Sequence, residues 1–317
     1  DGSDLPSWLN FSNGTFSGVP LNGDVGSLGI VVTASDGISS INTNFSLTIS
    51  NTNDAPDIAL NDISLKSVGD EFLVNTTTTN TQRESSIAGL HDGGFVVSWE
   101  SLGQDGSSNG IYAQRYAENG AKEGDQFLVN SYVTDSQQHA SIAALNDGGF
   151  VITWNSKGQD GATYGIYAQR YSIDANGDAQ GGGEFQVSTY ETNNPGHTSI
   201  TALADGGFVV AWNSVGQDGS GIGIYAQRYD ANGLEFGDSF LVNTDFTTGD
   251  QILSATTALA DGGYLISWSG NGAQDTYGIY AQRYDVNGVE LGDNFLVNTD
   301  YTSATQTNSA VAGLASS

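Results

Sequence analysis

Four copies of one sequence pattern make up most of this chain. Each copy contains an apolar stretch, an Asp-Gly-Gly turn, a segment ending in Trp, a Gln-Asp loop and the run Gly-Ile-Tyr-Ala-Gln-Arg-Tyr. The Trp residues that mark the period are Trp99, Trp154, Trp212 and Trp268. A unit of this length cannot bury a core alone and must stack on its neighbours, so the repeat predicts a propeller or a solenoid.

Each copy is expected to form four short strands, because alternating apolar residues run between turn signals. In the first copy the expected strands are 86–90, 95–99, 111–116 and 127–129. Single strands at 72–74 and 310–314 flank the four full copies. The predicted fold is therefore all-β, a β-propeller-like array of four-stranded repeats with four full units and partial ones. A longer chain would close a ring of five or more blades, and an open array is the alternative.

The first 57 residues do not carry the repeat. Their wording, LPSWLNF, TFSGVP, DVGSLGIVVTASDG and FSLTISNTNDAP, resembles the cadherin-like, dystroglycan-type modules of bacterial surface proteins. The resemblance implies a partial β-sandwich, because the leading strands of that family would precede this segment. The expected divisions are 1–57 for the cadherin-like module, 58–69 for a connector and 70–317 for the repeat domain, with units at 70–123, 124–182, 183–236, 237–291 and a partial 292–317.

The composition limits the classes of partner. A net charge of −28 with only eight Lys and Arg residues argues against nucleic acid and against anionic membranes. The chain has no Cys, which excludes disulfides and thiolate metal sites. No apolar run approaches the roughly 18 residues of a membrane span, so we expect no direct membrane insertion.

Strand direction predicts where a ligand would bind. The loops between the second and third strands lie on the same face as the crossovers between copies, and this face holds the long, variable loops. A sugar site needs aromatic plates beside polar acceptors. The candidate ligand-binding residues on this face are Gln104, Asp105, Gln159, Asp160, Tyr164, Gln217, Asp218, Gln274, Asp275 and Tyr277. The alternative is structural, since each Gln-Asp pair could tie its own loop as an Asx turn does.

A calcium site is expected at the end of the first module. Asn51, Asn53 and Asp54 match the interdomain calcium motif of cadherins, with Asn in place of the first Asp, and Asp36 could join them. Oxygen ligands of this kind suit calcium. The Asp-x-Asn-Gly segments of the repeats are read as hairpin turns instead.

Three other sets of residues receive structural interpretations. The repeat Trp side chains are expected in the core. The four Arg residues of the third strands are expected to pair with the Asp residues of the Asp-Gly-Gly turns. His139 and His197 occupy one equivalent position, where the other copies have Glu84 and Leu253. We expect these histidines to be solvated loop residues, with hydrogen bonding to a ligand as the alternative.

No enzyme signature is found in the sequence. The distance from Asp92 to Trp99 is two residues longer than in the Asp-box of sialidase-like propellers. With both halves considered, the chain resembles the ligand-binding region of a bacterial RTX-type surface adhesin. This resemblance implies an extracellular location on the bacterial cell surface, calcium as cofactor, type I secretion, and a monomeric module within a larger chain.

The function predicted from these features is a non-enzymatic lectin. It would bind cell-surface oligosaccharide, with fucosylated glycans as one candidate, for attachment or biofilm formation. The alternatives are a protein- or peptide-binding adhesin module and a calcium-stiffened spacer.

Overall fold

The computed structural model describes residues 5–21, 24–50, 70–161, 163–188, 196–272, 275, 277–300 and 304–313. Its regular elements are twenty β-strands, β1 to β20, which confirms the all-β prediction. The chain divides into two compact units, Asp1–Asp70 and Glu71–Ser317. Among the described residues, no helix is long and apolar enough to cross a membrane.

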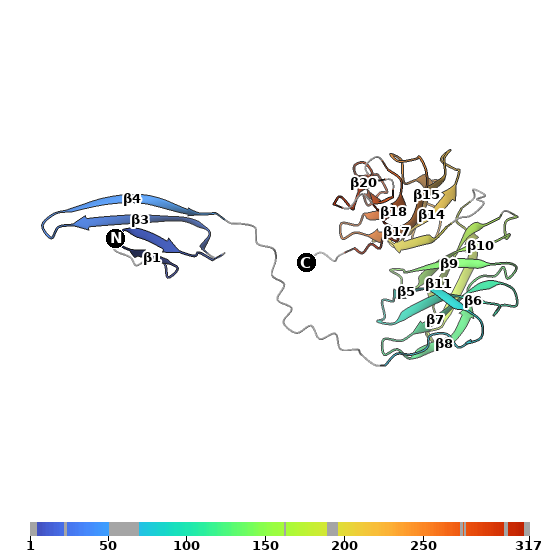
Figure 1. Ribbon diagram of the computed structural model, residues 1–317. Coiled ribbons are helices and arrows are strands. Elements are labelled where there is room, and N and C mark those ends of the chain that lie inside the picture. The colour runs from blue at the N-terminus through green and yellow to red at the C-terminus, as the bar shows by residue number, and fades with distance from the viewer. Residues whose placement is uncertain are drawn as a thin grey trace. The chain divides into compact units, whose positions relative to one another are not determined.

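The first unit contains two antiparallel strand pairs (Figure 1). One pairs β1 (Leu9–Ser12) with β2 (Thr15–Gly18), and the other pairs β3 (Gly26–Ser35) with β4 (Ser40–Ile49). The tight turn between β1 and β2 is Asn13-Gly14, and both residues adopt the positive φ that such a turn requires.

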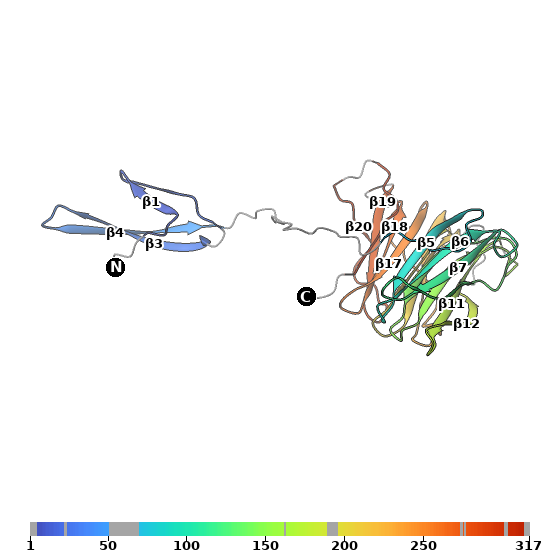
Figure 2. The same ribbon diagram turned by 90° about the horizontal axis from the view of Figure 1, so that it is seen from below.

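The second unit is a four-blade β-propeller arrangement, which confirms the architecture predicted from the repeat (Figures 1 and 2). Each blade is an antiparallel sheet of four strands in sequence order. Blade 1 consists of β5 (Gln82–Gly89), β6 (Phe95–Leu102), β7 (Asn109–Tyr116) and β8 (Lys122–Leu128). Blade 2 consists of β9 (Gln137–Ala144), β10 (Phe150–Ser156), β11 (Gly165–Ile173) and β12 (Ala179–Gln186). Blade 3 consists of β13 (Thr198–Ala202), β14 (Phe208–Val215), β15 (Ile222–Tyr229) and β16 (Phe240–Leu241). Blade 4 consists of β17 (Gln251–Ala258), β18 (Tyr264–Gly270), β19 (Gly278–Tyr284) and β20 (Phe295–Leu296).

Three of the four hydrophobic core clusters lie between neighbouring blades, and the fourth, which contains Trp99 and Tyr116, lies on blade 1 with Val74 packed against it. One core cluster joins Val96 and Ile111 of blade 1 to Phe150, Ile152 and Trp154 of blade 2, and equivalent clusters join blades 2 and 3 and blades 3 and 4. All four repeat Trp side chains are buried, as predicted. Each sheet therefore lends its neighbour an apolar face, which is why one unit of this length would not be stable alone.

Each repeat Arg pairs with the Asp of its own Asp-Gly-Gly turn, as predicted. The four pairs are Arg115 with Asp92, Arg170 with Asp147, Arg228 with Asp205 and Arg283 with Asp261. The other carboxylate oxygen of each Asp accepts the backbone N–H two residues later. The turn and the third strand are thereby joined within each blade.

The flanking strands predicted at 72–74 and 310–314 are not observed as strands. Residues 72–74 and 310–313 are described without strand pairing, and Leu314 lies outside the described residues. Apolar alternation alone predicted these strands, but a strand also needs a hydrogen-bonded neighbour. Phe72 and Val74 instead pack on blade 1.

Candidate metal centre

The predicted Gln-Asp pairs belong to the loops between the second and third strands of the blades, and Asp105, Asp218 and Asp275 form Asx turns there. The backbone N–H groups of Ser107, Ser220 and Tyr277 donate to the Oδ1 atoms of Asp105, Asp218 and Asp275 at 3.0–3.1 Å. Part of each carboxylate's hydrogen-bonding capacity is thus used inside its own loop.

The Gln residues of these pairs also bond locally. Ser101 and Ser214 donate their hydroxyls to Gln104 and Gln217 at 2.8 and 2.7 Å. The Gln159 side-chain amide donates to Glu184.

The remaining predicted loop residues lie in blades 2 and 4. The Asp160 carboxylate accepts from Gln186 at 3.0 Å. Tyr164 is half-buried and Tyr277 is exposed, and blade 3 separates their blades. Gln274 lies outside the described residues. Ligand binding by these loops stays a prediction.

The predicted calcium ligands Asn51, Asn53 and Asp54 lie outside the described residues. Asp36 is in the turn between β3 and β4, where its Oδ1 accepts from the N–H groups of Ile38 and Ser39 at 2.9 and 2.8 Å. These bonds lower the pKa of Asp36. Ile49 lies at the opposite end of this hairpin, about 30 Å from the turn at the usual strand rise, and calcium binding by the four residues stays a prediction.

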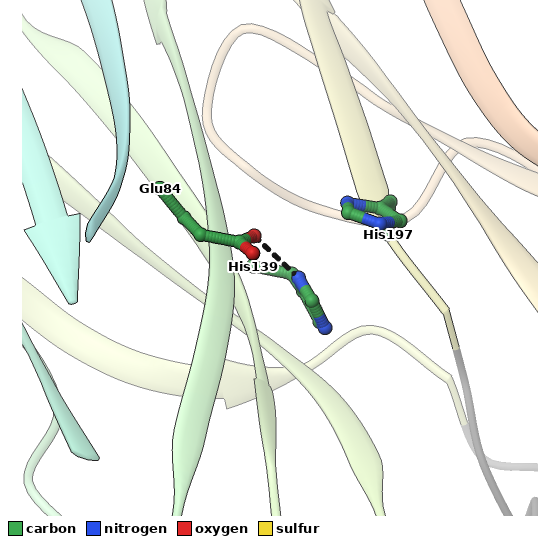
Figure 3. Close-up of side chains that lie close together, drawn as sticks. All are labelled: Glu84, His139 and His197. Carbon is green, nitrogen blue, oxygen red and sulfur yellow. Dashed lines mark hydrogen bonds and ion pairs between the residues drawn. The ribbon is translucent and has the colours of Figure 1, made fainter. Parts of the chain in front are cut away.

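A different cluster forms where the inner strands of blades 1, 2 and 3 converge (Figure 3). Glu84, His139 and His197 each offer one ligand atom, and these three atoms all lie within 4.8 Å of one another. The Nδ1 atom of His139 is 2.8 Å from the Oε2 atom of Glu84, and the two imidazole rings have centroids 4.2 Å apart. The expectation of a solvated loop residue is wrong for His139, which lies within β9 and is half-buried. His197 lies in the crossover that directly precedes β13.

β-Bulges in the inner strands β5 and β9 orient the side chains of Glu84 and His139. The pairing of β5 with β6 shifts between Arg83 and Ser86, and the pairing of β9 with β10 shifts at the equivalent place. Glu84 and His139 sit in these bulges with φ of 52° and 57°. A positive φ is uncommon for residues other than Gly, and bulges redirect side chains next to functional sites. Leu253 has the same backbone in blade 4, with φ of 59°, but its side chain cannot bind a metal.

Side chains on the second strands of blades 1 and 2 make hydrogen bonds to the backbone at the two histidines. The buried Glu100 accepts the His139 backbone N–H through Oε1 at 2.7 Å and pairs with Arg83 through Oε2 at 2.9 Å. At the equivalent position of blade 2, Asn155 donates its side-chain amide to the Gly196 carbonyl at 2.9 Å. Each blade therefore positions the cluster residue of the next.

The electrostatics of the cluster favour a neutral imidazole at His197. Burial, followed by the neighbouring His139, lowers the pKa of His197. A neutral imidazole is the form that binds metal ions.

Two imidazoles and one carboxylate form a donor set that suits Zn²⁺ and other divalent transition metals. Donor atoms in a tetrahedral zinc site lie roughly 3.3 Å apart, given bonds of about 2.0–2.1 Å, so small side-chain rotations would close the cluster around an ion. The sequence carried the signal for this site. His139, His197 and Glu84 share one repeat position, and equivalent positions on the inner strands of adjacent blades meet at the axis.

A family model matches the N-terminal segment. The family described as "Putative Ig domain" matches residues 1–50, so this segment is Ig-like. No curated protein matches the chain.

Similar solved structures include three glycoside hydrolases. They are an α-L-arabinanase from Penicillium chrysogenum (12% identity, TM-score 0.48, 70% of this chain and 68% of that one), an α-L-arabinofuranosidase from Fusarium graminearum (12%, 0.44, 67% and 65%) and the Hadza microbial sialidase Hz136 (9%, 0.45, 63% and 44%). The chain spans less than two thirds of the last two.

These comparisons correct the predicted function. The three structures named are those of enzymes, so the predictions of a non-enzymatic lectin and of a chain that is not an enzyme are withdrawn. At these identities and TM-scores, the matches assign no activity, substrate or catalytic residue to this chain.

Proposed function

We propose that the repeat domain binds a divalent transition-metal ion, Zn²⁺ among them, through Glu84, His139 and His197. The observation that carries the proposal is the convergence of these three potential ligands, each from a different blade, within 4.8 Å. Nitrogen donors distinguish the site from the all-oxygen sites that calcium and magnesium prefer.

The number of ligands bears on what the ion would do. Structural zinc sites are closed by four protein ligands, whereas sites that act on external molecules have three and keep one position open. The fourth equivalent position of the repeat carries Leu253, which cannot complete the shell. Since the described residues offer three ligands at this place, the site would present one coordination position to water or to an external oxygen ligand.

The test is a calorimetric titration of the full chain with Zn²⁺ after chelator treatment, in excess calcium to occupy weak acidic sites. We expect one site, with affinity falling at least tenfold in His139→Ala and in His197→Ala because each removes one of three ligands. His91→Ala is the matched control, since His91 is exposed in the Asp-Gly-Gly turn region of blade 1. Equal affinities in all four proteins would overturn the proposal.

The setting of this site is proposed on the sequence resemblance. We infer that the chain is a monomeric module of a larger bacterial surface adhesin, outside the cell, with calcium bound near residues 51–54 and cell-surface oligosaccharide as a partner. The Ig-like segment supports the extracellular location.

A further inference from the structure

Each junction between successive blades uses the same contacts. The Phe of a fourth strand lies against the last Tyr of the next blade's third strand, with ring centroids 5.3–5.4 Å apart. The Val two residues after that Phe is buried, and its exposed fraction is 3% at Val129, 3% at Val187 and 0% at Val242. These three junctions define what a complete blade interface looks like.

Residues 71–76 make the same contacts to blade 1. Phe72 lies 5.3 Å from Tyr116, and the Tyr116 hydroxyl donates to the Val74 carbonyl at 3.0 Å. Asn75 donates to Gln82 at 3.4 Å, as Asn130 donates to Gln137 after blade 1 at 3.3 Å. This segment therefore occupies the place of a fourth strand preceding blade 1.

Residues 304–313 occupy the place of a first strand following blade 4. Asn298 donates to Gln306 at 3.2 Å, repeating the Asn-to-Gln bond of the other crossovers. The hydroxyls of Ser309 and Ser267 are 2.9 Å apart. The junction of blades 2 and 3 has the same hydroxyl contact, between Thr153 and Thr198 at 3.1 Å.

Apolar positions that the inner junctions bury are exposed on these two outer faces. Val297 of blade 4 is 52% exposed, although its three equivalents are buried. Ile87 of blade 1 is 64% exposed, whereas its equivalents Ile142 and Ile200 are 6% and 7% exposed. A pocket of about 340 Å³ beside residues 71–76 is lined by Val97 and Trp99 among others. The successive inner strands β5, β9, β13 and β17 pack on one another, but among the described residues β17 makes no comparable contact with β5.

We propose that this opening between blades 4 and 1 docks a β-hairpin of the repeat's own type, equivalent to the second and third strands of a blade. The hairpin would pair with residues 304–313 on one side and with residues 71–76 on the other. Continuity with the three existing junctions supports this occupant, because a hairpin with the pattern of β14 and β15 presents one apolar face suited to blade 1 and another suited to blade 4. Residues 208–229 of this chain are a probe with that pattern.

The test uses single-cysteine reporters, because the chain has no Cys of its own. In the full chain, the introduced thiols of Val297→Cys and Ile87→Cys should react rapidly with a thiol reagent. The 208–229 peptide should slow both reactions at least tenfold. The thiol of Ile38→Cys, where Ile38 is 94% exposed in the first unit, should react at an unchanged rate.

A control peptide carries Val209→Asp and Ile224→Asp, which place charges on the face that packs against the following blade, and it should not protect. Because a free peptide can fail to form a hairpin, the same segment is also appended to the C-terminus of the chain through a Gly-Ser linker. Absence of protection by both the free and the appended hairpin would overturn the proposal. So would slow labelling of Val297→Cys in the unmodified chain together with dimers in sedimentation, because a second copy would then cover the opening.

Discussion

Removal of the carboxylates around Arg115 should reveal the cost of a buried guanidinium in this fold. Arg115 has a side-chain exposure of 5% and pairs with Asp92 and Glu123, and it also donates to the Gly177 carbonyl at 2.8 Å. The double variant Asp92→Ala/Glu123→Ala leaves only that carbonyl. A buried charge without its partners costs about 3–5 kcal/mol, and the lost Asx-turn hydrogen bond adds about 1 kcal/mol.

The matched control is Asp147→Ala in blade 2. It removes the same turn bond, between Asp147 and the Gly149 N–H, but Arg170 is 30% exposed and can be hydrated. An exposed pair contributes about 0–1 kcal/mol, so we expect a total loss of about 1–2 kcal/mol. The free energy of unfolding is measured in urea from Trp fluorescence, since four of the five Trp residues lie in the repeat domain. If the double variant and Asp147→Ala lose the same free energy of unfolding to within about 0.5 kcal/mol, Arg115 carries no burial cost and the prediction is refuted. It is also refuted if Arg115→Met, added to the double variant, does not restore stability.

Three further predictions concern the inner strands and the open faces. Glu84→Gly should raise the melting temperature of the metal-free protein, because Gly relieves the positive φ at this bulge, and should lower zinc affinity at the same time. Glu100→Ala should lower zinc affinity about 10–100-fold, as loss of supporting residues does, because Glu100 holds the His139 backbone; calorimetry that gives wild-type affinity would contradict this role. Val242→Ala should lower the free energy of unfolding in urea by about 1–2 kcal/mol, whereas Val297→Ala should change it by no more than about 0.5 kcal/mol. Equal losses would mean that Val297 is buried.

The architecture was predictable because the repeat fixes both the strand pattern and the need for stacking. The Asp-Gly-Gly turns and the Trp positions specify hairpins and core faces locally, and four blades follow. The pairing of each Arg with its own Asp was also predictable, because both lie at fixed offsets within one hairpin.

The candidate metal centre was not predicted, because it depends on contacts between copies. Glu84, His139 and His197 are separated by more than 50 residues each, and only the arrangement of blades shows that the first strands are innermost. The bulges that aim Glu84 and His139 arise from non-Gly residues at positive φ, which propensity rules do not anticipate. For the Gln-Asp loops the sequence left two interpretations open, a ligand site and an Asx turn, since it cannot show which polar atoms are already used.

The most direct test of the proposed centre is X-ray absorption at the zinc edge of the zinc-loaded full chain. The account predicts a first shell of nitrogen and oxygen at about 2.0–2.1 Å with scattering from two imidazoles, and from only one imidazole in His197→Ala. A shell of oxygen atoms alone, or an unchanged spectrum in His197→Ala, would contradict it.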